Sequence, residues 1–296
     1  MNIPAASLAM PVLRQRDTSL QVWRVNKHGT LVAGFADTVI TVTPEASRSN
    51  RRSEAILDAL QPCAPDIALH PLSTTAVNGS VVTVFPRGLA LEPSTETYTE
   101  ALALLKRLHC VQVSPLLPAL SNDFLAKGRY CPDTAWAALF EPTVVRLRDD
   151  IRCAIADERR RATEAFTCGA FANHPACLIH GDVQIENMIQ LNGALRLIDW
   201  EDARLDHPLM DIAQFFFANS VPQTDVKSLM AAYSPELQVS DLRLFSFLNF
   251  LWTTLFMQNH RALMDAARRW ALQHDLPPIL QGLCQDTLAS FEENTP

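Results

Sequence analysis

The chain has 296 residues, of which 48% are hydrophobic and 19% charged, so it can form one large domain or two lobes with a sizeable core. A formal net charge of −7 argues against nucleic acid as the main partner. The longest apolar run, residues 245–257, is too short to cross a bilayer, and the N-terminus lacks the basic start of a secretory signal. Scattered cysteines without a CxxC pair are typical of reduced thiols. We therefore expect a cytoplasmic protein with no membrane or nucleic-acid partner; the oligomeric state stays open.

The N-terminal part of the chain predicts a small antiparallel sheet. About the first 15 residues predict a frayed lead-in. Runs rich in Val, Thr and Ile, separated by turn residues, then predict three strands, at residues 20–25, 30–36 and 38–43. A helix follows over residues 49–60, where apolar side chains share one face.

A fourth strand is expected at residues 81–88, after the turn residues Asn78-Gly79. The polar residues 73–75 predict a loop before that turn. From Ser94 onward the pattern becomes helical, so we expect the boundary between two lobes within residues 85–93. The predicted lobes are residues 1–88 and residues 89–296.

The second lobe is expected to be helical except around one hairpin. A helix is predicted over residues 96–109, and long helical patterns fill residues 135–172. Further helices are predicted after the hairpin, at residues 211–219, 225–233, 240–258 and 259–273.

The hairpin brings polar residues to one place. Short apolar runs at residues 188–191 and 194–198 are joined by Asn192-Gly193, the strongest two-residue hairpin signal. Counting outward from that turn places Asn187 opposite Ile198. Asn187 and Asp199 should therefore lie at the open end of the hairpin, close enough to share an ion. Asp182 precedes that end by a short loop.

These residue types suit phosphoryl transfer from a nucleotide. That reaction needs a carboxylate to orient and deprotonate the attacking hydroxyl, and a carboxamide and a carboxylate to hold Mg²⁺ on the phosphates. Mg²⁺ prefers hard oxygen ligands and keeps several waters, so two protein ligands suffice. We assign Asp182 as the catalytic base and Asn187 and Asp199 as the metal ligands.

The segments HGD-x-x-x-x-N (residues 180–187), IDWEDA (residues 198–203) and Asp211-Ile212-Ala213 resemble the aminoglycoside phosphotransferase and choline kinase family of small-molecule kinases. Gly181 stands where the similar protein kinases have Arg. The resemblance implies an α+β, bilobal, protein-kinase-like fold, with a small antiparallel-sheet lobe that binds nucleotide and a mainly helical catalytic lobe. It also implies ATP (or GTP) and Mg²⁺ as cofactors. The acceptor would be a hydroxyl of a small, possibly cationic, metabolite or aminoglycoside-type antibiotic.

The resemblance also implies roles for further residues. His180 would hold the catalytic loop by hydrogen bonds, and Asp211 would support that loop or cap the helix that follows it. Further roles are implied on the acceptor side for Glu201, Asp202 and Trp252, and on the nucleotide side for Glu54, Arg51 and Phe85.

The nucleotide lobe departs from the family pattern. Thr41 stands where the third strand should carry a Lys or Arg for the phosphates, and a Gly-rich phosphate loop is missing. Basic residues that could reach the phosphates instead are Arg24, Lys27, Arg48, Arg51 and Arg52. A kinase-like binding protein or pseudoenzyme is therefore the alternative to an active kinase.

Two other interpretations have less support. A hydrolase using the acids alone lacks a nucleophile motif such as GxSxG. A zinc site at His180, Asp182 and Glu186 lacks the further His or Cys that such sites need. The intact set of Asp182, Asn187 and Asp199 favours an active kinase.

Overall fold

A computed structural model describes residues 21–25, 30–35, 37–44, 48–112, 125–126, 129–219 and 221–284. They form two compact units. The sheet unit comprises the described residues up to Leu91 together with Glu186–Ala203, and the helical unit comprises Glu92–Ile185 and the chain from Arg204 onward. Within these described ranges, none of the helices is long and apolar enough to cross a membrane.

Several predictions made from the sequence lie outside the described residues. The lead-in at residues 1–15 and Lys27 are among them. So are the side chains of Arg24, Arg48, Arg51 and Arg52, although the backbone of each lies in a strand or helix.

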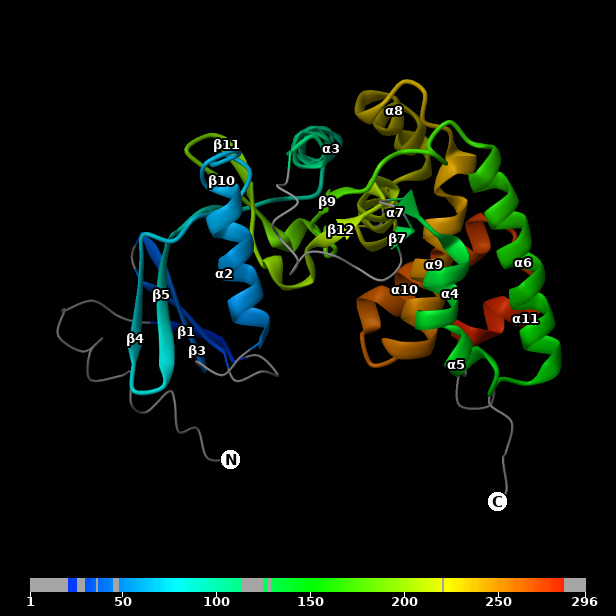
Figure 1. Cartoon of the computed structure of the whole chain (residues 1–296), viewed down its shortest axis with the longest axis horizontal. Helices are drawn as coiled ribbons and strands as arrows, with labels where there is room; N and C mark the ends of the chain where they lie inside the picture. Colours follow the sequence, from blue (N-terminus) through cyan, green and yellow to red (C-terminus); the bar gives the residue numbers. More distant parts are fainter. Residues whose placement is uncertain are drawn as a thin grey trace, which may run out of the picture. The chain divides into compact units, whose positions relative to one another are not determined.

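The sheet unit is built on a five-stranded antiparallel sheet in the order β1-β2-β3-β5-β4 (Figure 1). The predicted strands appear as β1 (Gln21–Val25), β2 (Leu31–Phe35), β3 (Thr38–Pro44) and β5 (Ser80–Pro86). Alternate residues of β2 and β3 form its core, at Leu31, Ala33, Ile40 and Val42. This period of two is what a sheet with one buried face requires. Helix α2 (Arg48–Leu60) follows as predicted and buries Ile56 and Leu60.

The loop predicted at residues 73–75 is wrong. Those residues belong to the edge strand β4 (Ser73–Val77), which pairs with β5 across the Asn78-Gly79 turn. Both turn residues have positive φ, 49° and 75°, as a tight hairpin turn requires. Both faces of β4 are largely exposed. Its first three residues are polar, so the apolar and β-branched runs that identified the other strands are not matched here.

A second sheet of the sheet unit explains why residues 186–203 fold with the N-terminal part. Its strands are β11 (Ala194–Leu197), β10 (Met188–Leu191) and β6 (Leu89–Ala90), in that order. Gly88 allows this pairing, because a Cβ at that position would lie 2.6 Å from Ile189 Cδ1 and 3.0 Å from the Gln190 carbonyl oxygen. The assignment of residues 1–88 and 89–296 to nucleotide and catalytic roles stays a prediction.

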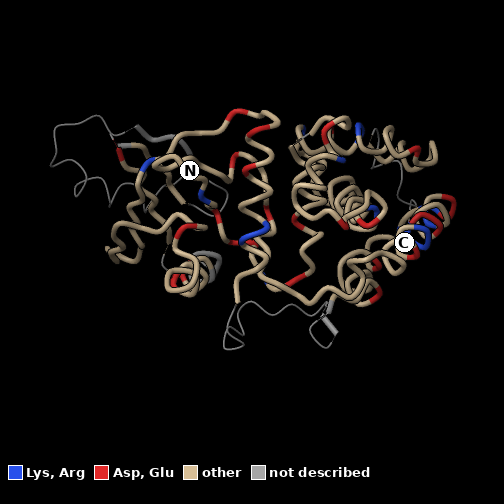
Figure 2. Tube along the Cα trace, turned by 90° about the horizontal axis from the view of Figure 1, so that it is seen from above, with Lys and Arg blue, Asp and Glu red and all other residues tan. Residues whose placement is uncertain are grey.

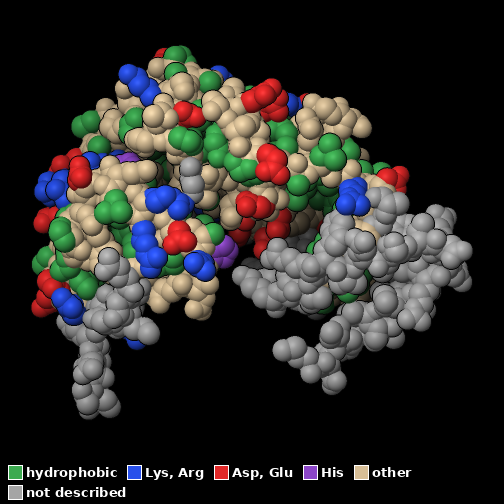
Figure 3. Space-filling model, turned by 180° about the vertical axis from the view of Figure 1, so that it is seen from behind, with side chains coloured by type: hydrophobic (Ala, Val, Ile, Leu, Met, Phe, Trp, Pro, Cys, Tyr) green, Lys and Arg blue, Asp and Glu red, His purple; other side chains and the backbone are tan. Residues whose placement is uncertain are grey.

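The helical unit is dominated by α9, which buries most of its residues and packs against α6 and α7. Its helices are α3 (Thr95–His109), α4 (Pro132–Leu139), α5 (Glu141–Val144), α6 (Asp149–Cys168), α7 (Pro208–Ala218), α8 (Gln223–Tyr233), α9 (Val239–Phe256), α10 (Arg261–Gln273) and α11 (Pro278–Gln281). Charges of both signs line α6 (Figure 2), and charged side chains are interspersed with apolar ones on the face of this unit in Figure 3.

Several details of the helical unit differ from the prediction. Two short strands that were not expected, β7 (Leu125–Ala126) and β8 (Arg129–Tyr130), pair with each other. The helical pattern at residues 135–172 is divided into α4, α5 and α6, because Pro142 and the turn before Asp149 interrupt it. Strand β12 (Arg204–Asp206) was not predicted. It pairs with β9 (Cys177–Ile179), so the two ends of the segment that carries the candidate site lie side by side.

Candidate active site

Asp182 lies in a loop that leaves β9 at Ile179 and turns sharply. His180 is completely buried, and Gly181 has a φ of 81°. An L-residue with a side chain adopts such a φ only with strain, so glycine at this position permits the turn. The turn leaves Asp182 half-buried.

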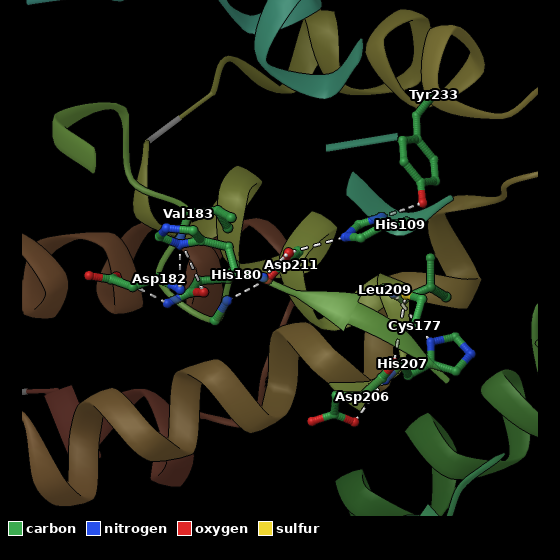
Figure 4. A network of polar contacts seen from close by, with 12 residues as sticks. His109, Cys177, His180, Asp182, Val183, Asp206, His207, Leu209, Asp211 and Tyr233 are labelled. Carbon is green, nitrogen blue, oxygen red and sulfur yellow. Dashed lines mark hydrogen bonds and ion pairs between the residues drawn. The ribbon is translucent and has the colours of Figure 1, made fainter. Parts of the chain in front are cut away.

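The backbone of this loop is held by Asp211. The amides of His180 and Gly181 donate to Asp211 Oδ2 and Oδ1 at 2.8 and 2.9 Å (Figure 4). His109 Nε2 lies 3.1 Å from Asp211 Oδ2. Burial by itself raises the pKa of Asp211, but the hydrogen bond and charge of His109 and the amide of His180 outweigh it and lower that pKa. A buried carboxylate needs such partners to stay charged.

Tyr233 extends this network into α8. Its hydroxyl lies 2.7 Å from His109 Nδ1 (Figure 4). Burial, with the negative charge of Asp211, raises the pKa of Tyr233, so the phenol keeps its proton. Tyr233, His109 and Asp211 thus form a buried chain of polar groups that ends on the loop backbone.

Helix α7 supplies three polar side chains to the loop. Besides Asp211, Gln214 Oε1 accepts from the Val183 amide at 3.4 Å. Asn219, at the C-terminal end of the helix, accepts from the Ile185 amide at 2.8 Å and donates to the Val183 carbonyl at 3.0 Å. A buried irregular loop has to satisfy its backbone polar groups with side chains, and α7 provides them.

Sequence reasoning missed Gln214 and Asn219 and left two roles open for Asp211. Asp211 is not the N-cap of α7, because the helix begins at Pro208 and His207 caps it, its Nδ1 accepting from the Leu209 amide at 3.2 Å. Asp211 and Gln214 are the polar residues in an otherwise apolar helix. That contrast was the available signal for a buried polar function.

The Asp182 carboxylate accepts hydrogen bonds from carboxamides. Gln184 Nε2 donates to Asp182 Oδ1 at 2.8 Å, and Gln214 Nε2 lies 3.5 Å from the same oxygen. His180 Nδ1 accepts from the Asp182 amide at 3.3 Å. His180, Asp182 and Asp211 are therefore brought together, with His180 in a hydrogen-bonding role.

The candidate metal ligands lie at the open end of the hairpin in the sheet unit. The pairing Leu191 with Ala194 is confirmed, and the Ile198 amide donates to the Asn187 carbonyl at 3.0 Å. The predicted register is therefore confirmed. Asp199 is exposed and has a φ of 63°, an uncommon conformation that Asp tolerates better than most residues.

This donor set fits Mg²⁺ rather than zinc. No group of three or more His, Cys, Asp or Glu side chains suited to a metal occurs in the described ranges. Mg²⁺ is usually bound by one or two protein oxygens together with substrate phosphates, and does not need such a cage. Asn187 and Asp199 offer a carboxamide and a carboxylate oxygen of this kind.

Other predicted residues fall on several elements. In the sheet unit, Glu54 is half-buried on α2, Phe85 is half-buried on β5, and the side chain of Arg51 is not among the described ones. Glu201 and Asp202 form, with Trp200, a 3₁₀ turn, η3 (Trp200–Asp202), beside α2. In the helical unit, the Trp252 side chain on α9 is 44% exposed.

One observation bears on the departure of the nucleotide lobe from the family pattern, and another on the segment IDWEDA. Thr41 lies in the middle of β3, opposite Val32 and Thr83, so the third strand does carry Thr at its centre. Trp200 is buried and its Nε1 donates to the Leu197 carbonyl at 3.2 Å, which makes it a core residue.

Solved structures with the same architecture include small-molecule kinases. A choline/ethanolamine kinase family protein from Mesorhizobium loti is 19% identical, with a TM-score of 0.58 over 94% of this chain and 96% of that one. Choline kinase LicA from Streptococcus pneumoniae is 13% identical, with a TM-score of 0.57 over 95% and 99% of the two chains. A thermostable mutant of aminoglycoside phosphotransferase APH(4)-Ia, in a ternary complex with AMP-PNP and hygromycin B, is 14% identical, with a TM-score of 0.61 over 95% and 100%.

At such identities the likeness shows the fold, and it confirms the predicted α+β, protein-kinase-like class with an antiparallel N-terminal sheet and a mostly helical C-terminal part. A search among curated proteins found no match. The model of the phosphotransferase enzyme family matches residues 14–243. The chain therefore belongs to this family, in which the small-molecule kinases are found.

Proposed function

We propose that this chain transfers the γ-phosphoryl group of ATP or GTP to a hydroxyl group of a small molecule, with Asp182 as the base. The observation that carries the proposal is the fixed loop around Asp182. Its amides at His180, Gly181, Val183 and Ile185 are hydrogen-bonded to side chains of α7. A carboxylate on so constrained a backbone can align and accept a proton from an attacking hydroxyl without reorganising.

Mg²⁺ belongs to this proposal. Asn187 and Asp199 would hold it through their side-chain oxygens, and the bound ion would neutralise charge on the nucleotide phosphates. The confirmed register at the hairpin end supports the pairing of these residues. Family membership supports nucleotide as the phosphoryl donor.

The acceptor is proposed to be a small, cationic hydroxylated compound. Trp252 and Phe256 are partly exposed on one face of α9, and their ring centroids are 4.9 Å apart. Such a pair can receive a cation over its faces. The acids Glu201 and Asp202 and the net charge of −7 also favour a cationic acceptor. We propose a cytoplasmic location for this activity.

The second candidate is a kinase-like binding protein without turnover. Thr41 at the centre of β3 favours it, because that position lacks the cation expected to contact the phosphates. Glu54, Arg51 and Phe85 remain the proposed nucleotide-side residues. The retained Asp182 favours the active kinase, since a protein that only binds Mg-nucleotide needs metal ligands but no base.

Thermal shift with Mg-ATP and Mg-GTP, followed by ADP or GDP release over hydroxylated amines and aminoglycosides, tests the proposal. We expect a shift with at least one nucleotide, and turnover that Asp182→Asn abolishes. A shift without turnover on any acceptor would support the binding protein. Turnover that survives in Asp182→Asn would show that another residue is the base.

A further inference from the structure

Among the hydrogen bonds of the described residues, Gln214 is the one residue of α7 that contacts both the backbone of the Asp182 loop and the Asp182 carboxylate. Its Oε1 accepts from the Val183 amide at 3.4 Å, and its Nε2 lies 3.5 Å from Asp182 Oδ1. Asp211 and Asn219, the other polar residues that α7 offers to the loop, contact only backbone atoms there. Gln214 therefore links the position of the backbone to the orientation of the acid.

The contact of the Gln214 carboxamide with Val183 determines which of its two ends faces Asp182. Val183 offers an N–H, so the carboxamide must present its oxygen to that side and its NH₂ group to Asp182. The opposite orientation would set donor against donor at Val183. Gln184 adds a second NH₂ group on the same carboxylate oxygen, at 2.8 Å. One oxygen of Asp182 is thus approached by two neutral donors from different segments of the chain.

We propose that Gln214 is a positioning residue for phosphoryl transfer, which together with Gln184 fixes the rotamer of the Asp182 carboxylate. This inference rests on the proposed function, because it assumes that Asp182 is the base. A base must be held within a fraction of an ångström of its productive geometry, and small misplacements reduce the rate strongly. The distances of 3.4 and 3.5 Å are at the long end of hydrogen bonding, which is common at catalytic groups before substrate binds.

Two substitutions separate the two ends of the carboxamide. Gln214→Leu removes both contacts. Gln214→Glu keeps an acceptor for the Val183 amide but replaces the donor that faces Asp182 with a negative charge. We expect kcat to fall roughly tenfold or more in both variants, with the KM for nucleotide unchanged.

Acidification distinguishes a positioning role from a merely structural one. Once protonated, the carboxyl group introduced by Gln214→Glu regains an O–H donor for Asp182, because two close carboxylates share one proton. The kcat of Gln214→Glu should therefore recover toward that of the native enzyme as the pH falls, while Gln214→Leu should not recover. Gln273→Glu, on an exposed part of α10, is the matched control and should follow the native pH profile.

A measurement without substrate tests the same contact. The neighbouring acid raises the folded-state pKa of the introduced carboxyl group, so the folded variant binds the extra proton and gains stability as the pH falls. We expect the Tm of Gln214→Glu to lie about 3 °C or more below that of the native protein at pH 8. The gap should close toward pH 5. In an Asp182→Asn background it should be small at every pH.

These measurements distinguish failure of the positioning role of Gln214 from failure of the proposed function. A Tm gap that is independent of pH, or the same with Asp182 and with Asn at that position, would refute the contact between Gln214 and Asp182. If Asp182→Asn abolishes turnover while both Gln214 variants keep the native kcat, Gln214 has no positioning role and the base assignment stands. If Asp182→Asn is fully active, the proposed function itself is wrong.

Discussion

The loop around Asp182 and the hairpin that carries Asn187 and Asp199 are stabilised in different ways. The hairpin is fixed by backbone pairing between residues that are neighbours in sequence, from Leu191 and Ala194 outward. The Asp182 loop has little backbone pairing of its own and depends on side chains from α7. These side chains, Asp211, Gln214 and Asn219, follow one another at intervals of about one helical turn. Local register thus places the proposed metal ligands, whereas long-range side-chain contacts place the proposed base.

Replacement of Asp182 should have the largest effect on activity. Asp182→Asn removes the proton acceptor but keeps an oxygen for the Gln184 amide, so the loop should stay in place. We expect kcat to fall by roughly 10²–10⁴, the usual contribution of general base catalysis. Steady-state kinetics measures the loss, and an unchanged Tm and nucleotide-induced thermal shift would show that the fold is retained. A kcat near the native value would contradict the assignment.

Removal of Asp211 should destabilise the Asp182 loop and lower the free energy of unfolding. Asp211→Ala leaves the amides of His180 and Gly181 without an acceptor and His109 without its carboxylate. Breaking a buried pair in this way costs about 3–5 kcal/mol. Urea denaturation measures the free energy of unfolding. A loss below about 1 kcal/mol would mean that the loop finds other partners, contrary to the role given to α7.

Acid should weaken the N-terminus of α7 through His207. Burial lowers the pKa of His207 to about 4, although its hydrogen bond to the Phe171 carbonyl opposes the shift. Between that value and the ordinary pKa of about 6.5, only the unfolded chain binds the proton, so stability is lost as the pH falls through this window. We expect about 2.5 kcal/mol of this loss between about pH 7.5 and pH 4.5.

The substitution His207→Asn isolates this contribution. Asn can cap α7 through its side-chain oxygen but does not titrate. The variant should therefore lose less stability over the same pH range, as measured by urea denaturation at several pH values. Equal losses in the two proteins would exclude His207 as the cause.

On the hairpin side, Asp199→Ala should affect the metal rather than the fold. Asp199 is exposed, so its loss should cost the fold about 1 kcal/mol at most, chiefly from placing Ala at a positive φ. Because one of the two proposed ligands is lost, we expect the Mg²⁺ concentration for half-maximal activity to rise about tenfold or more. The Mg²⁺ concentration that gives half of the nucleotide-induced thermal shift should rise in the same way. The same Mg²⁺ dependence in native and variant proteins would exclude Asp199 as a ligand.

The smallest effect tests the hairpin turn itself. Gly193 has a φ of 77°, and a Cβ there would meet nothing within 4 Å. Gly193→Ala should therefore cost about 1 kcal/mol by conformational strain alone. Gly282→Ala is the matched control, because its surroundings are equally open and its φ is −59°. It should be neutral or slightly stabilising, and equal effects of the two substitutions on the free energy of unfolding would contradict the strain at Gly193.

The contrast between loop and hairpin also decides what could be predicted from the sequence. The strands β1, β2, β3 and β5 and the hairpin register follow from short apolar and β-branched runs between turn residues, and were predicted. Strand β4 was missed because it begins with three exposed polar residues. Gln214 and Tyr233 could not be placed, because their partners in the site lie tens of residues or more away in the chain, and no local pattern encodes such contacts.

The dependence of the Asp182 loop on α7 has a consequence for biosynthesis. The loop leaves the ribosome before α7, since Ile185 precedes its partner Asn219 in the chain. Its amides at His180, Gly181, Val183 and Ile185 thus lack their acceptors until that later helix emerges and docks, a delay of roughly 2 to 7 s at ordinary elongation rates. A nascent chain truncated before residue 208 would hold the Asp182, Asn187 and Asp199 side chains and still lack an ordered base.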